Sequence, residues 1–289
     1  HTGKTGPCAL ALIKAGVSKV IAAMLDPNPQ VSGSGFQLLI DAGIEVQYGL
    51  LESQAESLNK GFVSRFSRNR PWLTCKLAMS LDGRTALVDG VSQWITGSAA
   101  RNDVQKLRAS QDAIITGIGT LMADNPSLNV RAEDDWFSIA KEVGFSQPAR
   151  ILFDTKQRAK SSAKFFNDDA EVYWLSATKS SDTFDGNIHR IERSDSLQKQ
   201  LNYFSELGMN NLLLESGHRL AGEFLKQGLI DELVVYMAPK LMGNKAMGLF
   251  DLDIKYMSQT PELKLVDLRQ LGEDIRLTYR FETDQLKNK

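Results

Sequence analysis

The sequence has 289 residues, 42% of them apolar, which is enough to fill the core of one large or two modest domains. Its 34 basic and 35 acidic residues give a formal net charge of −1, so it carries no general attraction for nucleic acid or for an anionic membrane. No apolar run reaches the roughly 18 residues that a spanning helix needs, and the first residues lack a secretory pattern. We therefore expect a cytoplasmic protein with reduced thiols at Cys8 and Cys75 and with no nucleic-acid or membrane partner.

The first 70 residues predict an alternation of helices and strands typical of an α/β domain. A polar stretch that begins at Arg65 ends at Pro71, a residue that cannot continue a helix. We place a domain boundary there, which gives domains 1–70 and 71–289. The expected elements before the boundary are helices over 9–15, 34–42 and 53–66, a buried strand over 19–25 and a second strand over 44–48.

The second part restarts the alternation with six apolar strand candidates separated by helical patterns. These candidates span 72–80, 113–116, 150–154, 171–175, 212–215 and 232–238. Two further strands, 263–268 and 275–281, lie close together around a Gly-Glu-Asp turn, as in an antiparallel hairpin. The prediction is a mostly parallel mixed sheet with an antiparallel C-terminal edge, and a surface insertion over 132–147.

Three places carry residues suited to chemistry. Lys76 lies in an apolar strand and needs an anion, unless it faces solvent beside a simple Asp82-Gly83 turn. Residues 117–119 form Gly-Ile-Gly after a strand, which allows backbone amides to approach a ligand, although a plain strand-to-helix turn gives the same pattern. Residues 215–218 combine a strand end, a glycine turn and a helix start, which suits a dinucleotide phosphate.

Individual residues at these places leave alternatives open. His218 fits a helix-capping or surface position better than a catalytic one. Arg108 and Arg131 are candidates for a substrate phosphate, because a guanidinium group matches phosphate geometry, but each alone could be a surface arginine. Basic, acidic and glycine residues recur at strand ends of one predicted sheet, and this recurrence favours a single ligand site.

The combination resembles a known family. Residues 72 to about 281 look like the reductase domain of the bifunctional diaminohydroxyphosphoribosylaminopyrimidine deaminase and 5-amino-6-(5-phosphoribosylamino)uracil reductase of riboflavin biosynthesis. That domain has a fold similar to dihydrofolate reductase, which implies the same mixed sheet here. The motifs that carry the resemblance are residues 76–83, 92–97, 117–120, 124–126, 215–217, 228–232 and 238–243.

The resemblance implies NADPH as cofactor and a phosphoribosylated pyrimidine as substrate, with Lys76 beside the ribose and Asp124 in a positioning or proton-transfer role. The implied NADPH contacts are Ala78, Trp94, Thr120, Asp124, Thr155, Gly217, His218, Arg219, Leu220, Ala221, Gly222 and Glu223. The implied substrate contacts are Ser92, Arg108, Leu128, Arg131 and Glu215. Two positions depart from the family pattern, since His218 replaces a small or cyclic residue and Thr155 replaces a frequent serine.

Residues 1–8 resemble the end of the deaminase zinc motif in the same family, and Cys8 matches its last zinc cysteine. The matching histidine, glutamate and first cysteine would lie upstream of His1. We therefore expect a partial cytidine-deaminase-like domain at 1–70, with zinc and deamination only in a complete domain. By itself, Cys8 could equally be a small buried hydrophobic residue.

Two other functions remain open at this stage. One is a dihydrofolate-reductase-like enzyme with a different substrate, although a substrate without phosphate would not need Arg108 and Arg131. The other is a non-catalytic protein that binds NADPH or serves in oligomerisation. Exposed apolar surface on a partial deaminase domain would also favour a homo-oligomer.

Overall fold

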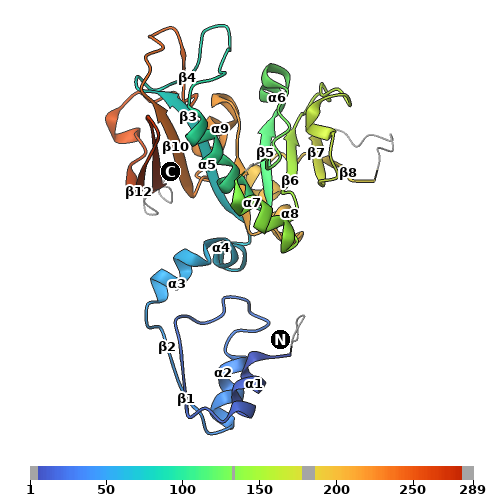
Figure 1. Cartoon of the computed structure of the whole chain (residues 1–289), viewed down its shortest axis with the longest axis vertical. Helices are drawn as coiled ribbons and strands as arrows, with labels where there is room; N and C mark the ends of the chain where they lie inside the picture. Colours follow the sequence, from blue (N-terminus) through green and yellow to red (C-terminus); the bar gives the residue numbers. More distant parts are fainter. Residues whose placement is uncertain (1–5, 132–133, 178–185, 282–289) are drawn as a thin grey trace. The chain divides into compact units, whose positions relative to one another are not determined.

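The computed structural model describes residues 6–131, 134–177 and 186–281. The chain forms two compact units, His1–Pro71 and Trp72–Lys289. Figure 1 shows both units and labels their helices and strands where there is room. No helix within the described ranges is long and apolar enough to cross a membrane.

The first unit is a small α/β arrangement around a core of Ala9, Leu39 and Ile44. Strands β1 and β2 pair in parallel, with Val20 opposite Val46, and both valines pack against this core. The elements are α1 (Cys8–Ala15), β1 (Lys19–Ala22), α2 (Ser34–Asp41), β2 (Glu45–Tyr48), α3 (Glu52–Leu58) and α4 (Lys60–Arg68).

Two expectations for this unit were wrong. The buried strand predicted over 19–25 ends at Ala22, and Ile21 is 57% exposed, because α1 and α2 cover only the face of the two-stranded sheet that carries Val20. The single helix predicted over 53–66 is two helices that meet at Asn59. The Asn59 side chain donates a hydrogen bond to the Ala55 carbonyl (3.0 Å), a local bond that competes with continuation of the helix.

The second unit contains a nine-stranded sheet in the order β12-β13-β10-β3-β9-β5-β6-β7-β8. All neighbouring strands are parallel except at the β10–β13 and β12–β13 pairs. The strands are β3 (Trp72–Ser80), β5 (Ala113–Gly117), β6 (Ala149–Phe153), β7 (Val172–Ser176), β8 (Ile188–Glu192), β9 (Asn211–Leu214), β10 (Glu232–Ala238), β12 (Leu263–Leu271) and β13 (Asp274–Phe281). The mostly parallel sheet with an antiparallel C-terminal hairpin is confirmed.

Three strands were not predicted. β8 forms the outer edge of the sheet, and with two isoleucines among its five residues it gives only a weak apolar signal. The other two, β4 (Arg84–Ala86) and β11 (Met247–Gly248), are too short to give a periodic pattern, and they pair with each other.

Helices cover both faces of the large sheet, and the strand alternation decides which side chains each face receives. On one face, Phe204 of α8 and Phe224 of α9 pack in a core with Leu73 and Cys75 of β3. On the other face, α5 packs over Tyr236 of β10. The helices of this unit are α5 (Ser98–Ala109), α6 (Ile118–Asp124), α7 (Asp135–Glu142), α8 (Leu197–Glu206) and α9 (His218–Lys226), with short 3-10 turns at Lys164–Phe166 and Met257–Gln259.

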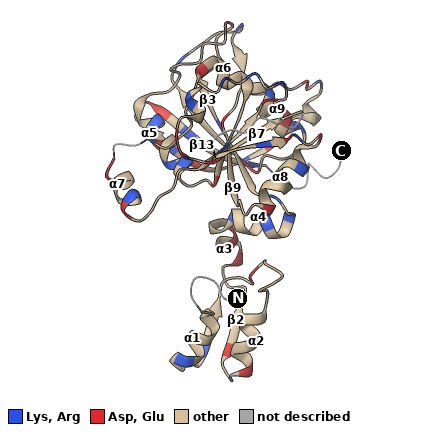
Figure 2. Ribbon diagram, turned by 90° about the vertical axis from the view of Figure 1, so that its right-hand side faces the viewer, with Lys and Arg blue, Asp and Glu red and all other residues tan. Residues whose placement is uncertain are grey.

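The α5 face of the sheet receives a charged side chain from β3. Because Leu73, Cys75 and Leu77 face α8 and α9, Lys76 faces α5, where a charged group needs partners. Figure 2 shows basic and acidic segments interspersed along this unit, in keeping with the balanced composition.

Candidate active site

Three charged side chains meet on the α5 face. β3 and β9 pair in parallel with Cys75 opposite Leu214, so Lys76 of β3 and Glu215, the residue that follows β9, lie side by side. The Lys76 Nζ is 3.7 Å from the Glu215 Oε2. Arg108 of α5 donates two hydrogen bonds to the same carboxylate, from Nε to Oε1 (2.6 Å) and from Nη2 to Oε2 (3.1 Å). The result is a buried carboxylate held between two cations.

Burial and neighbouring charges act in opposite directions on these groups. Burial alone would raise the pKa of Glu215, but Arg108 and Lys76 outweigh it and lower that pKa below its ordinary value. Burial lowers the pKa of Lys76, and the nearby Arg108 cation adds to this effect, while Glu215 opposes it. Glu215 is therefore a fixed anion, and Lys76 releases its proton more readily than an exposed lysine.

The lysine rests on an aromatic ring that is itself held in place. The Lys76 Nζ lies 5.7 Å from the centre of the Tyr236 ring. The Tyr236 hydroxyl donates to Asp103 of α5 (2.7 Å), and Asp103 also accepts a hydrogen bond from Arg276 of β13 (2.9 Å). Burial, together with the hydrogen bond to Asp103, raises the pKa of Tyr236 and keeps the ring neutral. Sequence reasoning missed this support, since nothing local in the sequence joins these residues.

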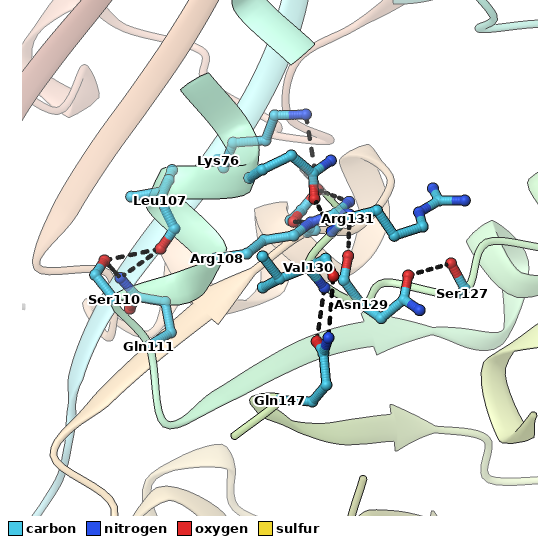
Figure 3. Close-up of polar contacts among 12 residues, drawn as sticks. Lys76, Leu107, Arg108, Ser110, Gln111, Ser127, Asn129, Val130, Arg131 and Gln147 are labelled. Atoms are coloured by element: carbon cyan, nitrogen blue, oxygen red, sulfur yellow. Dashed lines mark hydrogen bonds and ion pairs between the residues drawn. The ribbon is translucent and has the colours of Figure 1, made fainter. Parts of the chain in front are cut away.

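The segment between α6 and α7 contacts the group formed by Lys76, Glu215 and Arg108, which we call the ionic cluster. Arg108 uses a third donor, Nη1, to bind the Asn129 carbonyl (3.1 Å). Leu128 is buried (4% exposed) and has a left-handed backbone with φ of 51°, which is unusual for a bulky residue. The Arg131 amide donates to Gln105 of α5 (2.8 Å), while the Arg131 side chain extends away from the ion pairs of Arg108 (Figure 3). Within the described residues, the Arg131 guanidinium has no hydrogen bond or ion pair.

Two other predicted site residues, Ser92 and Asp124, meet at the end of α6. The Ser92 hydroxyl lies 3.3 Å from the Asp124 Oδ1 and donates to it. Burial raises the pKa of Asp124, and the hydrogen bond from Ser92 only partly opposes the shift. The Asp124 carboxyl therefore keeps its proton to a higher pH than an exposed aspartate does.

A third contact joins the turns that follow β5 and β9. The Gly217 amide donates to the Thr120 hydroxyl (3.1 Å), which ties the start of α9 to α6. Asp124 is one helical turn after Thr120 in α6, and Glu215 is two residues before Gly217. The three contacts therefore gather at one place, around the carboxyl ends of β9 and β5, where parallel sheets place ligands.

The first turn of α9 contains most of the predicted cofactor residues, and they differ in their surroundings. Gly217 precedes the helix, which has no side-chain cap, and an added Cβ there would meet nothing closer than the Thr120 hydroxyl at 3.8 Å. Ala221 is fully buried, and its amide donates to the Gly217 carbonyl. Gly222 faces the backbone of Asp251, where a Cβ would lie 2.8 Å from the carbonyl oxygen. Ala221 and Gly222 thus serve the packing of α9.

The other members of this turn lie nearer to the surface. Arg219 is exposed, whereas His218, Leu220 and Glu223 are half-buried. His218 is the first residue of α9, and its carbonyl accepts a hydrogen bond from the Asp251 amide (3.2 Å). Leu220 packs against Gly117, where a Cβ would come within 3.2 Å of the leucine side chain.

Ala78 and Trp94 lie at the carboxyl end of β3 and in the loop after β4. Ala78 is half-buried on the α5 face, opposite Tyr236 of β10. Trp94 is exposed, with the Arg101 guanidinium 4.8 Å from its ring centre and its carbonyl accepting a hydrogen bond from Lys240 (2.8 Å).

Thr155 stands apart from the other predicted residues, after β6. It is exposed, and its hydroxyl accepts a hydrogen bond from Arg193 (2.7 Å). It follows β6, which lies two strands away from β9 in the sheet, so it is remote from the ionic cluster. Arg193 is a neighbour that the sequence did not single out.

Cys8, the predicted zinc ligand, is the first residue of α1 and is exposed. Over the residues that the structure describes, no group of three or more histidine, cysteine, aspartate or glutamate side chains is placed to hold a metal ion. A zinc deaminase site needs three protein ligands. The described part of this chain does not supply them, and we derive no chemical step through zinc.

Comparisons with known proteins identify the family of this chain. A family model described as the RibD C-terminal domain matches residues 71–277. The riboflavin biosynthesis protein RibD of Haemophilus influenzae is 44% identical over 289 residues, covering 96% of this chain and 77% of that protein. The protein of the same name from Escherichia coli is 39% identical over 287 residues, covering 96% of this chain and 78% of that protein.

Solved structures give the same result. Acinetobacter baumannii RibD, form 1, superposes with a TM-score of 0.90 at 41% identity, covering 98% of this chain and 78% of that one. A diaminohydroxyphosphoribosylaminopyrimidine deaminase/5-amino-6-(5-phosphoribosylamino)uracil reductase from Thermotoga maritima gives a TM-score of 0.84 at 27% identity, covering 98% and 76%. This chain belongs to the RibD family, and its residues 71–277 form the RibD C-terminal domain.

Proposed function

We propose that this chain is the reductase of riboflavin biosynthesis that converts 5-amino-6-(5-phosphoribosylamino)uracil to its ribitylamino product with NADPH. The observation that carries the proposal is the buried Lys76–Glu215–Arg108 cluster, which lies at the carboxyl end of β9, beside the middle of β3 and close to the uncapped start of α9. The named activities of the Thermotoga maritima relative support the same reaction.

The start of α9 fits a dinucleotide phosphate. Its first amides have no side-chain cap, and there is open space beside Gly119 and Gly217, where no heavy atom lies within 3.4 Å of an added Cβ. Free amides and the helix dipole both favour an anion there. We assign phosphate binding to residues 217–220, with Thr120 holding the turn and with Ala78, Trp94 and Thr155 along the rest of the cofactor. NADPH, when bound, supplies the hydride that reduces the sugar.

The ionic cluster fits the ribosyl part of the substrate. Ionised Glu215 accepts hydrogen bonds from sugar hydroxyl groups, and Lys76 donates to their oxygens. Arg108 holds Glu215 in one orientation with a bidentate contact, so the acceptor is positioned before the substrate arrives. The remaining N–H donors of Arg108 and the Arg131 guanidinium bind the substrate phosphate.

Asp124 fits a proton-transfer or positioning role. Its raised pKa brings the protonated and ionised forms closer in energy than in an exposed aspartate, which is what a general acid needs. Ser92 fixes the orientation of the carboxyl group and, in this proposal, also binds the substrate.

The first unit fits a partial cytidine-deaminase-like domain. It has a parallel β1–β2 pair covered by α1 and α2, and Cys8 stands at the start of α1. We propose deamination only for a chain in which this domain is complete.

The test is to mix the purified chain with NADPH and the deaminated substrate and to follow loss of the near-ultraviolet absorbance of NADPH. The aminated precursor serves as the control. Oxidation with the deaminated substrate alone supports the proposal. Tight NADPH binding without oxidation would indicate a related reductase with another substrate, and absence of NADPH binding would refute the reductase assignment in favour of a non-catalytic role.

A further inference from the structure

The segment 125–131, which we call the 125–131 loop, has an unusual backbone next to the ionic cluster. Asn125 and Leu128 both have left-handed conformations, with φ of 42° and 51°. Such conformations persist only where the surroundings hold them. The loop contains Arg131, which binds the substrate phosphate in the proposed function, and Leu128, which the family resemblance implies as a substrate contact.

Four side chains from outside the loop bind its backbone, and they come from different parts of the fold. Arg108 of α5 binds the Asn129 carbonyl, and Gln105 of α5 accepts from the Arg131 amide. Arg150 of β6, fully buried and paired with Asp168, donates to the Ser127 carbonyl (3.1 Å).

Gln147 makes the most complete of these contacts. Its Oε1 accepts from the Val130 amide (2.7 Å), and its Nε2 donates to the Val130 carbonyl (3.0 Å), as Figure 3 shows. The side chain thus satisfies both backbone groups of one residue, as a neighbouring strand would. Gln147 is the last residue of the segment that the sequence indicated as a surface insertion, and it is half-buried.

Three consecutive backbone amides of the 125–131 loop are left available to bind a ligand. Within the described residues, the amides of Ser127, Leu128 and Asn129 form no hydrogen bond, whereas the next two amides are bound by Gln147 and Gln105. Consecutive free amides around a left-handed residue form a concave anion site. The Arg131 guanidinium follows this row directly, and it too has no partner among the described residues.

We propose that Gln147 is a positioning residue for the substrate phosphate. It acts through Val130, fixing the loop so that the three free amides and Arg131 converge on one phosphate group, and it does not itself touch the substrate. This inference rests on the proposed function, because that function supplies the phosphate. It adds a residue from outside the predicted site to the recognition of the phosphorylated end.

The variant Gln147→Met tests the proposal, because it keeps the length of the side chain and removes both hydrogen bonds. We expect KM for the phosphorylated substrate to rise at least tenfold, with kcat within about threefold of wild type. We expect no change in NADPH affinity or in KM for the same substrate without its phosphate. The conservative variant Gln147→Glu keeps the acceptor for the Val130 amide and should show an intermediate KM.

The matched control is Gln198→Met on α8, where the glutamine binds Asn202 on the same helix (2.7 Å). It should leave all constants at wild-type values. Equal increases in KM for the phosphorylated and dephosphorylated substrates in Gln147→Met would overturn the proposal, because they would indicate a general structural defect. An unchanged KM for the phosphorylated substrate would overturn it as well.

Binding of ribose 5-phosphate, measured by calorimetry without NADPH, separates this inference from the proposed function. If wild type binds ribose 5-phosphate, and Gln147→Met binds it at least tenfold more weakly, the inference stands even where no reduction is seen. If wild type reduces the substrate and the variant matches it in both assays, only the inference fails. Absence of both reduction and ribose 5-phosphate binding in wild type refutes both.

Discussion

Replacement of Glu215 by glutamine is the perturbation that examines the ionic cluster most directly. Glu215→Gln keeps the shape of the side chain and one acceptor oxygen, but it removes the charge that Arg108 and Lys76 share. Both cations would then remain in a buried site without an anion. We expect the variant to lose stability and, because Glu215 also binds the sugar in our proposal, to lose at least about 100-fold in kcat/KM.

The magnitude follows from burial. Removing one partner of a buried ion pair lowers the free energy of unfolding by about 3–5 kcal/mol, and the Glu215 side chain is only 9% exposed. The retained hydrogen-bond acceptor places our expectation near the lower end, about 3 kcal/mol. The matched control is Glu171→Gln, since the Glu171 side chain is 52% exposed and pairs with His189 at the surface. There we expect less than about 1 kcal/mol.

Urea denaturation followed by tryptophan fluorescence is a suitable assay. All four tryptophans lie in the second unit, so the signal reports the unit that contains the cluster. The pH dependence gives a second measurement. Because the pKa of Glu215 is lowered in the folded protein, its contribution is present above the ordinary value of 4.5 and is lost as pH falls through the lowered pKa. The stability difference between wild type and Glu215→Gln should therefore shrink in acid.

One further variant identifies the source of the destabilisation. Adding Lys76→Met to Glu215→Gln removes one unpaired cation, so the double variant should be more stable than Glu215→Gln alone. A Glu215→Gln protein within about 1 kcal/mol of wild type would refute the reasoning, because a buried, doubly paired carboxylate cannot be neutralised at so small a cost.

The remaining predictions concern single groups. Asp124→Asn should lower kcat by about 100-fold or more, and retained turnover would remove Asp124 from the mechanism. The variant should not lower stability at neutral pH, because the raised pKa of Asp124 in the folded protein means that its ionised carboxyl disfavours folding at that pH. Gly222→Ala should reduce the free energy of unfolding by about 1–3 kcal/mol, because its Cβ would lie 2.8 Å from the Asp251 carbonyl oxygen, and an unchanged urea midpoint would argue against that close packing. The stability of wild type should rise with pH between the lowered pKa of Lys76 and the ordinary value of 10.5, and Lys76→Met should flatten this rise, as urea titrations across that range would show.

The sequence alone predicted the mixed sheet because strand and helix patterns are local. Apolar runs bounded by glycine and proline marked β3 and β10 at their observed ends, and the Gly-Glu-Asp turn marked the antiparallel hairpin. The residue types of the site were also visible, because a lysine in an apolar strand and a glutamate at a strand end both need partners. Resemblance to a known family then gave these residues their expected roles, and the comparisons confirmed the family.

Only the tertiary structure decided which of those residues meet. Arg108 and Glu215 are 107 residues apart, and their contact depends on the register between β3 and β9 and on the position of α5 over the sheet. The support from Tyr236 and the Gln147 contact with Val130 have no local signal, because each joins segments that are brought together by packing of the core. The periodicity of apolar residues in the sequence indicates which face of a strand is buried. The register between strands, the desolvation of charged groups and their pKa shifts depend on neighbours that are distant in the chain.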